Sequence, residues 1–305
     1  VEAPLSLPGH IADLRARAAS SDDTVDAQLA ATLLALMARE GITSAQPERW
    51  LGAGGTPTTD EEYQGDVKLS PSQFERALAC PLRWFLTTIG ADGPSNAAAS
   101  LGTLVHALAE ENPHGTAEEL TEALEARIEE LGYNLDTWAG RHADRHARAI
   151  VDNLASYLVG VPGRVEVERM VEAQIEGVTI RGRMDRLEHV DEGVRVTDLK
   201  TGKGGHSAKT VPDNPQLAAY QMALLASGAQ VAGARIALLG GDKPKTFDQK
   251  PLEGKTLEEW RGKVREVAAI ARGPYFEATP SEDACRYCSF DRLCPARERG
   301  RKVVE

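Results

Sequence analysis

The sequence predicts a mixed α/β fold in which helices flank one central mixed sheet. Before about residue 160, the chain is rich in Ala, Leu and charged residues, and helix-start signals recur along it. Residues 164–200 instead alternate apolar and polar side chains and accumulate β-branched residues, which is typical of strands. After residue 214 we expect a helix, a strand and another helix in turn, so both kinds of element contribute to the fold.

The composition of the 305-residue chain limits its function. Its 46 acidic and 35 basic side chains give a net charge of −11, and 42% of its residues are hydrophobic. An acidic protein does not bind nucleic acid through its bulk charge, so a nucleic-acid site requires a local basic groove or metal ions. No apolar run approaches the roughly 18–20 residues of a membrane helix. The N-terminus does not resemble a signal peptide, and we expect a cytoplasmic protein without a membrane partner.

Two regions are expected along the chain. Residues 1–65 form a helical appendage, with helices over 10–18 and 26–40 and a linker rich in Gly, Pro and Thr over 52–66. Residues 66–305 form the main domain.

The main domain opens on a strong helix-start signal. Ser70 is a good N-cap, Pro71 suits the first helical position and Gln73 completes a capping box, so a helix should run from there to Cys80. Further helices are expected from near Ser100, over 116–131 and over 141–158.

Turn signals divide the strand region into three antiparallel strands. They lie at Glu176-Gly177 and at 191–193. A helix over 215–227, a strand over 231–239 and a helix over 256–271 follow. Residues 280–299 are rich in Cys and should be irregular.

Two carboxylates are expected on neighbouring strands. Asp198 and Lys200 are two residues apart and share a strand face, and Asp185 lies on the preceding strand. A two-residue loop would place Asp185 opposite Asp198, whereas a three-residue loop would place it opposite Leu199 and point it away. Adjacent carboxylates need a cation between them, and Mg²⁺ or Mn²⁺ suits oxygen ligands. A solvated hairpin explains the same spacing equally well.

Four motifs in order resemble the RecB-like branch of the PD-(D/E)xK nucleases over residues 69–295. They are Gly102-x-x-x-His106, Gly182-x-x-Asp185, Asp198-x-Lys200 and Gln216-x-x-x-Tyr220. The resemblance implies a restriction-endonuclease-like core. It also implies that His106, Asp185, Asp198 and the Leu199 carbonyl bind the metal. Lys200 would then serve the attacking water, and Gln216 and Tyr220 would position DNA or neighbouring groups.

The four cysteines, Cys80, Cys285, Cys288 and Cys294, suit a metal site better than disulfides. Their spacing allows either Zn²⁺ or a 4Fe–4S cluster. Their arrangement resembles the iron–sulfur staple of AddB-type nuclease domains, which implies a 4Fe–4S cluster, with a zinc staple as the alternative. Either site would be structural and would tie the start of the domain to its C-terminus.

Other features favour plain structural roles. The sequence around Gly254-Lys255-Thr256 lacks the earlier glycine of a phosphate-binding loop. His142 and His146 are typical of a solvated helix face. Trp138, like Trp84, is expected in the core. The loop containing Lys203 should lie near the active site.

The resemblance implies Mg²⁺-dependent hydrolysis of DNA, on single strands or DNA ends, as in the RecBCD, AddAB and AdnAB helicase–nucleases that process double-strand breaks. A helicase subunit or domain would be the partner, and the chain would be a C-terminal fragment. The alternatives are a stand-alone RecB-family nuclease acting on RNA or DNA, and a non-catalytic iron–sulfur-stapled DNA-binding or scaffold module.

Overall fold

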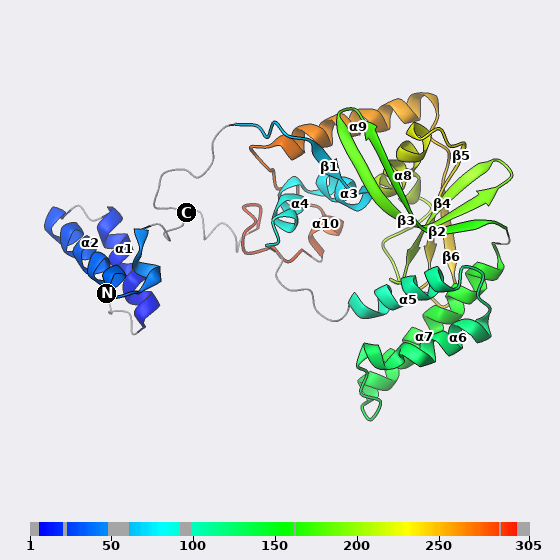
Figure 1. The fold of residues 1–305 in the computed structure, drawn as a ribbon, viewed down its shortest axis with the longest axis horizontal. Coiled ribbons are helices and arrows are strands. Elements are labelled where there is room, and N and C mark those ends of the chain that lie inside the picture. Colours follow the sequence, from blue (N-terminus) through cyan, green and yellow to red (C-terminus); the bar gives the residue numbers. More distant parts are fainter. Residues whose placement is uncertain are drawn as a thin grey trace. The chain divides into compact units, whose positions relative to one another are not determined.

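The computed structural model describes residues 6–20, 23–47, 61–91, 99–161, 163–286 and 288–297 (Figure 1). The chain divides into two compact units, residues 1–61 and 62–305. Most of the linker predicted over 52–66 lies outside the described residues.

The first unit is a small helical hairpin. Helices α1 (Leu7–Ser20) and α2 (Thr24–Arg39) are followed by a 3₁₀ turn, η1 (Thr43–Ala45). The Asp23 carboxylate caps α2 by accepting hydrogen bonds from the backbone N–H groups of Val25 and Asp26. Buried apolar residues from all three elements form its core: Ile11, Leu14, Ala30, Leu34 and Ala45.

The second unit contains the predicted mixed sheet. Its six strands are β1 (Val67–Leu69), β2 (Val165–Ile175), β3 (Val178–Val190), β4 (Gly193–Lys200), β5 (Val231–Leu238) and β6 (Lys245–Gln249). The order is β1-β3-β4-β5-β6, and β2 pairs with the other edge of β3. The β1–β3 and β4–β5 pairs are parallel and the rest are antiparallel. Sequence analysis missed β1 and β6, which are too short for a clear alternating pattern.

Two tight turns set the register of the central strands. Glu176 and Gly177 both have positive φ, 50° and 78°, as a type I′ hairpin turn requires. Val190 pairs with Gly193 across a two-residue turn. Continuing that register places Asp185 opposite Asp198, which is the arrangement that a metal site needs.

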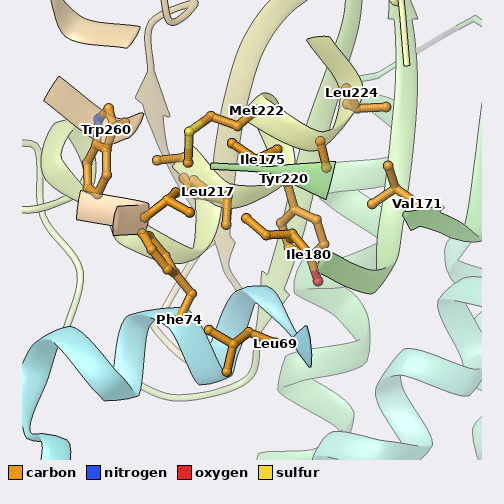
Figure 2. Packing of buried hydrophobic residues seen from close by; sticks show 14 of the residues in the cluster. Leu69, Phe74, Val171, Ile175, Ile180, Leu217, Tyr220, Met222, Leu224 and Trp260 are labelled. Carbon is orange, nitrogen blue, oxygen red and sulfur yellow. The ribbon is translucent and has the colours of Figure 1, made fainter. Parts of the chain in front are cut away.

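Helices cover both faces of the sheet and create two cores. On one face lie α3 (Pro71–Ala79), α8 (Pro215–Ala226) and α9 (Gly254–Arg272), and on the other lie α5 (Ala99–Glu111), α6 (Ala117–Arg127) and α7 (Trp138–Val159). Figure 2 shows the first core, where Phe74 and Trp260 flank Leu217, with ring centroids 6.4 Å apart. Leu154 and Leu199 belong to the second core.

The remaining elements refine the predicted ones. A separate helix, α4 (Pro81–Thr88), follows α3 after Cys80, and α10 (Glu282–Arg286) lies in the tail that we predicted to be irregular. Two 3₁₀ turns, η3 (Ile128–Leu131) and η4 (Val211–Asp213), precede α7 and α8. In the described parts of the chain, no helix has both the length and the apolarity to cross a membrane.

The two cores test the predictions for tryptophan. Trp84 is buried as expected, but Trp138 is 70% exposed. The prediction for Trp138 was wrong because the residue starts α7 ahead of the part of the helix that packs in the second core.

Strand pairing leaves a gap on one edge of β3. β1 pairs with β3 as far as Ile180, and β4 pairs with it only from Arg186 onward. Among the described strands, none pairs with residues 181–185 on this edge. The backbone groups on this edge of residues 181–185 are therefore available to side chains of other elements, and the space beside them can hold a site.

We expect Gly182→Ala to destabilise the second unit by about 1–3 kcal/mol, because overpacking forces neighbouring atoms to move. A Cβ at residue 182 would lie 2.5 Å from Cδ of Pro71 and 3.2 Å from Cε1 of Tyr220. Urea denaturation would measure the loss. Gly204→Ala is the matched control, because no atom lies within 4 Å of its added Cβ. Equal stability of both variants would contradict the predicted clash.

Candidate metal centre

The Asp185 carboxylate occupies the gap between β3 and β4. Its Oδ2 accepts a hydrogen bond from the backbone N–H of Leu199 at 2.8 Å, in the place where a paired strand would supply a carbonyl. Its Oδ1 lies 3.4 Å from Nδ1 of His106. The Asp185 side chain thus accepts the hydrogen bond of the last unpaired backbone N–H on β4. Its other oxygen, Oδ1, remains available to a cation.

His106 approaches Asp185 from the helix α5. Its hydrogen bond with Asp185 raises the pKa of the imidazole, and this effect outweighs the burial that would lower it. The carboxylate of Asp185 thus stabilises positive charge at His106. A metal ion bound beside Asp185 would replace that proton.

Asp198 is almost fully buried beside Lys200. Its Oδ1 accepts a hydrogen bond from Nε2 of Gln216 at 2.7 Å, and Nζ of Lys200 lies 2.7 Å from Oδ2. Oδ2 is buried, and its partner is the ammonium of Lys200. Burial raises the pKa of Asp198 to about 6, although the charge of Lys200 opposes the shift.

Lys200 carries its positive charge in this setting. Burial lowers the pKa of its ammonium, but the carboxylates of Asp198 and Asp185 outweigh burial, and the net shift is upward. Its Nζ also donates a hydrogen bond to Oε1 of Gln216 at 3.4 Å. Lys200 is therefore a fixed cation at this site in the metal-free protein.

Helix α8 holds the two strands at the gap. The Asn214 side chain caps the helix by accepting from the backbone N–H of Leu217, which places Gln216 on the first turn. The Tyr220 hydroxyl, one turn later, donates to the carbonyl oxygen of Arg183 at 2.8 Å. Burial raises the pKa of Tyr220, so it stays protonated and remains a donor.

Glu168 is a site residue that sequence analysis missed. It lies on β2 with φ 50°, a backbone conformation that is rare for a non-glycine residue. Its carboxylate pairs with Arg183, and burial raises its pKa. The signal was present in the Glu176-Gly177 turn, because a two-residue turn there places residue 168 opposite Asp185.

The structure gathers three potential ligands. Single donor atoms from His106, Glu168 and Asp185 all lie within 4.8 Å of one another, and Asp198 is not in that group. A cavity of about 490 Å³ opens on the three residues. Imidazole and carboxylate donors fit a divalent cation such as Mg²⁺ or Mn²⁺, and Asp198 lies on the neighbouring strand with its Oδ2 held by Lys200.

The four cysteines line one cavity of about 430 Å³, together with Arg83, Arg286 and Arg297. Hydrogen bonds tie the two segments together beside it. The Thr279 hydroxyl donates to the carbonyl of Ala79 at 2.9 Å, and Arg83 donates to the carbonyl of Ala284 at 2.7 Å. Cys80 is thereby brought to thiols more than two hundred residues later in the chain.

The distances between the four cysteine sulfurs differ between a bound zinc ion and an iron–sulfur cluster. Four Zn–S bonds of about 2.3 Å in a tetrahedron place the sulfurs about 3.8 Å apart. Across the described residues, no three cysteine sulfurs lie within 4.8 Å of one another. A cluster of several iron atoms holds its thiolates farther apart than zinc does, and the cavity has room for either group.

Metal affinity should fall as the pH decreases through about 6. The carboxylate of Asp198 must be deprotonated to bind a cation, and its pKa in the metal-free protein is raised to about 6 by burial. Below that pH a proton on Asp198 competes with the metal and lowers the affinity by up to about tenfold per pH unit, in addition to the loss from protonation of His106, whose pKa is raised by its hydrogen bond with Asp185. Calorimetric titration with Mn²⁺ would measure this. Asp198→Asn should bind more weakly and with a flatter pH profile, whereas an affinity independent of pH would refute a role for Asp198.

Comparison with known proteins gives matches over this unit. The family model of the PD-(D/E)XK nuclease superfamily matches residues 68–295. The "Gene 69 protein" of Mycobacterium phage D29 is 25% identical over 265 residues, which cover 74% of this chain and 96% of that protein. The "Gene 69 protein" of Mycobacterium phage L5 is 26% identical over 133 residues, covering 42% of this chain and 44% of that protein.

A solved structure, a "Putative exonuclease" from Eubacterium rectale, shares 15% identity with a TM-score of 0.44. The superposition covers 76% of this chain and 94% of that one.

Proposed function

The chain belongs to the PD-(D/E)XK nuclease superfamily, and on that premise we propose that it is a divalent-metal-dependent deoxyribonuclease. One observation carries the proposal. The turn after Val190 places Asp185 opposite Asp198 at a gap in the sheet, with Lys200 beside Asp198. Carboxylates at this gap in the sheet can hold a metal ion that activates water for phosphodiester hydrolysis. The lysine beside them can stabilise the charge that develops on the phosphate.

The cation would be Mg²⁺ or Mn²⁺. His106, Asp185 and Asp198 would hold it, with the Leu199 carbonyl or Glu168 as a further ligand. When bound, it would polarise a phosphate oxygen and acidify a water molecule. Glu168, which sequence analysis missed, lies with His106 and Asp185, and its ion pair with Arg183 would have to loosen to admit the cation.

Lys200 would act through its charge. Its pKa is raised by the surrounding carboxylates, so it is an ammonium group at neutral pH and not a general base. It can donate hydrogen bonds that orient the attacking water and stabilise the negative charge that develops on the phosphate. Gln216 fixes Oδ1 of Asp198, and Tyr220 fixes the backbone of Arg183, so both act as positioning residues.

For the substrate and the setting, we propose single-stranded DNA or DNA ends, delivered by a helicase subunit or domain during double-strand break repair. The four ordered motifs support this, because they resemble the RecB-like branch. Cytoplasmic action is supported by the four free thiols, which suit a reducing compartment.

For the cysteines, we propose a 4Fe–4S cluster as a structural staple. The shared cavity and the three arginines around it support a bound metal group, and the resemblance to the AddB-type staple favours iron, with a zinc staple as the alternative. Four thiolates and a cluster carry net negative charge, which the arginines would offset.

Incubation with labelled single-stranded DNA and Mg²⁺ tests the nuclease. We expect cleavage by the parent chain, and a loss of at least about a hundredfold in Asp198→Asn, because removing one charged group that stabilises a transition state costs about this much. The cleavage rate of Gln216→Ala should lie between those of the parent and Asp198→Asn. Lys255→Gln is the control, since the Lys255 side chain is 92% exposed on α9, which contributes no residue to the proposed site.

Two outcomes would contradict the nuclease proposal. Equal cleavage by the parent and Asp198→Asn would place the activity elsewhere. No cleavage by the parent, with or without a helicase partner, would favour a non-catalytic DNA-binding module. Parallel reactions with RNA would identify the sugar that the site accepts.

Anaerobic purification tests the staple. The protein should be brown and contain about four iron atoms per chain, and Cys80→Ser should lose both the iron and thermal stability, because the loop between Cys80 and the tail is then no longer closed. A colourless protein with one zinc atom would refute the iron assignment and keep the staple. Metal-free protein of unchanged stability would refute both.

A further inference from the structure

The exposed face of α7 carries basic side chains, and the first residue of the helix is a tryptophan. Trp138, Arg141, His142, Arg145 and His146 follow the i, i+3, i+4, i+7, i+8 spacing of a single helix face. None of these side chains is buried, whereas Ala147, Ile150 and Leu154 bury the opposite face. On a protein with a net charge of −11, such a face needs an explanation.

The acidic residues of α7 do not neutralise this face. Asp144 belongs to another side of the helix, where it pairs with Arg148 at 3.2 Å. Arg148 also pairs with Glu125 of α6 at 3.0 Å. Arg145 has no ion pair with any residue that the structure describes, so its charge faces solvent.

Trp138 is 70% exposed, although large apolar rings are usually covered. Its ring stacks on that of His142, with centroids 5.3 Å apart and parallel planes. This contact orients the indole and leaves its other face open. A flat, pre-oriented ring beside cations is the arrangement on which proteins stack unpaired bases.

The basic face continues toward the metal centre. Asn153 of α7 donates to the carbonyl oxygens of Leu239 and Gly241, and a Cβ at Gly240 would lie 2.3 Å from the carbonyl oxygen of Thr201, so α7 lies beside the start of the loop that carries Lys203. Lys203 and His206 in turn line a cavity of about 630 Å³ with Glu75 and Asn214. Asn214 caps α8, and Gln216 on the first turn of that helix accepts a hydrogen bond from Lys200, so this cavity lies next to the catalytic lysine.

We propose that the basic face of α7 binds single-stranded nucleic acid and guides it past Lys203 to the metal centre. This inference rests on the proposed nuclease function and adds the path of the substrate. Trp138 would stack on a base, and Arg145 and Lys203 would neutralise phosphates. The nine residues from Trp138 to His146 span about 12 Å along the helix axis, enough for about three nucleotides.

Fluorescence anisotropy with a labelled oligothymidylate, without divalent metal, would measure binding to the full chain before any hydrolysis. We expect Trp138→Ala to weaken binding by about 5- to 150-fold, since one base loses its stacking partner. Trp138→Phe should retain most of the affinity. Arg145→Gln should reduce the slope of log affinity against log salt by about 0.7, the value for one phosphate contact on a single strand.

Lys255→Gln is the matched charge control, because Lys255 is fully solvated on α9. It should change neither the affinity nor the salt slope. Thermal melting should be the same for all the variants, since each change lies on the surface. An oligouridylate titrated in parallel would show whether the face prefers DNA or RNA, and a loss with either polymer supports the proposal.

A small phosphodiester, thymidine 5′-(p-nitrophenyl) phosphate, separates this inference from the nuclease proposal. It reaches the metal centre without touching α7, so Trp138→Ala should hydrolyse it at the parental rate with Mn²⁺ while cleaving the oligonucleotide poorly. If the parent hydrolyses neither, the nuclease proposal fails and the binding titration still tests the face. Parental affinity in Trp138→Ala, with an unchanged salt slope in Arg145→Gln, would overturn the inference.

Discussion

The hydrogen bond from the backbone N–H of Leu199 to the Asp185 carboxylate is the contact on which the rest of the site depends. β3 and β4 stop pairing after Arg186 and Thr197, and an unpaired amide at that point would be costly. The carboxylate satisfies it and so holds the strands apart while keeping Asp185 beside His106. A continuous ladder would have closed the space in which a cation and a phosphate could sit.

Helix α8 makes this gap stable from the other side. It is buried around most of its circumference, yet its Gln216 and Tyr220 reach polar groups on both strands. Gly182 allows this approach, because Pro71 and Tyr220 pack where a side chain would otherwise project. In the Gly182-x-x-Asp185 motif, the glycine is thus required for packing, and the aspartate is required for its contacts with Leu199 and His106.

Electrostatics sets what the site can hold. Asp198 is buried with its Oδ2 against the ammonium of Lys200, which compensates only part of the negative charge around the two carboxylates. Buried carboxylates that are not fully paired favour either a proton or a metal ion. The basic groups on α7 and around Lys203 lie outside this acidic centre, so an acidic protein can still offer phosphates a favourable approach.

Local sequence determined much of this arrangement, because a hairpin register depends only on its turn. Glu176-Gly177 and the turn after Val190 align residues 168 and 198 with Asp185, although sequence analysis missed Glu168 and left the register of Asp198 open between two loop lengths. The capping boxes at Ser70 and Thr116 likewise acted through neighbouring residues. Tertiary structure decided the rest: the cavity shared by Cys80 and the C-terminal thiols, and the exposure of Trp138. Both depend on how helices pack across hundreds of residues, and that packing is a sum of many weak contacts that no short pattern in the chain encodes.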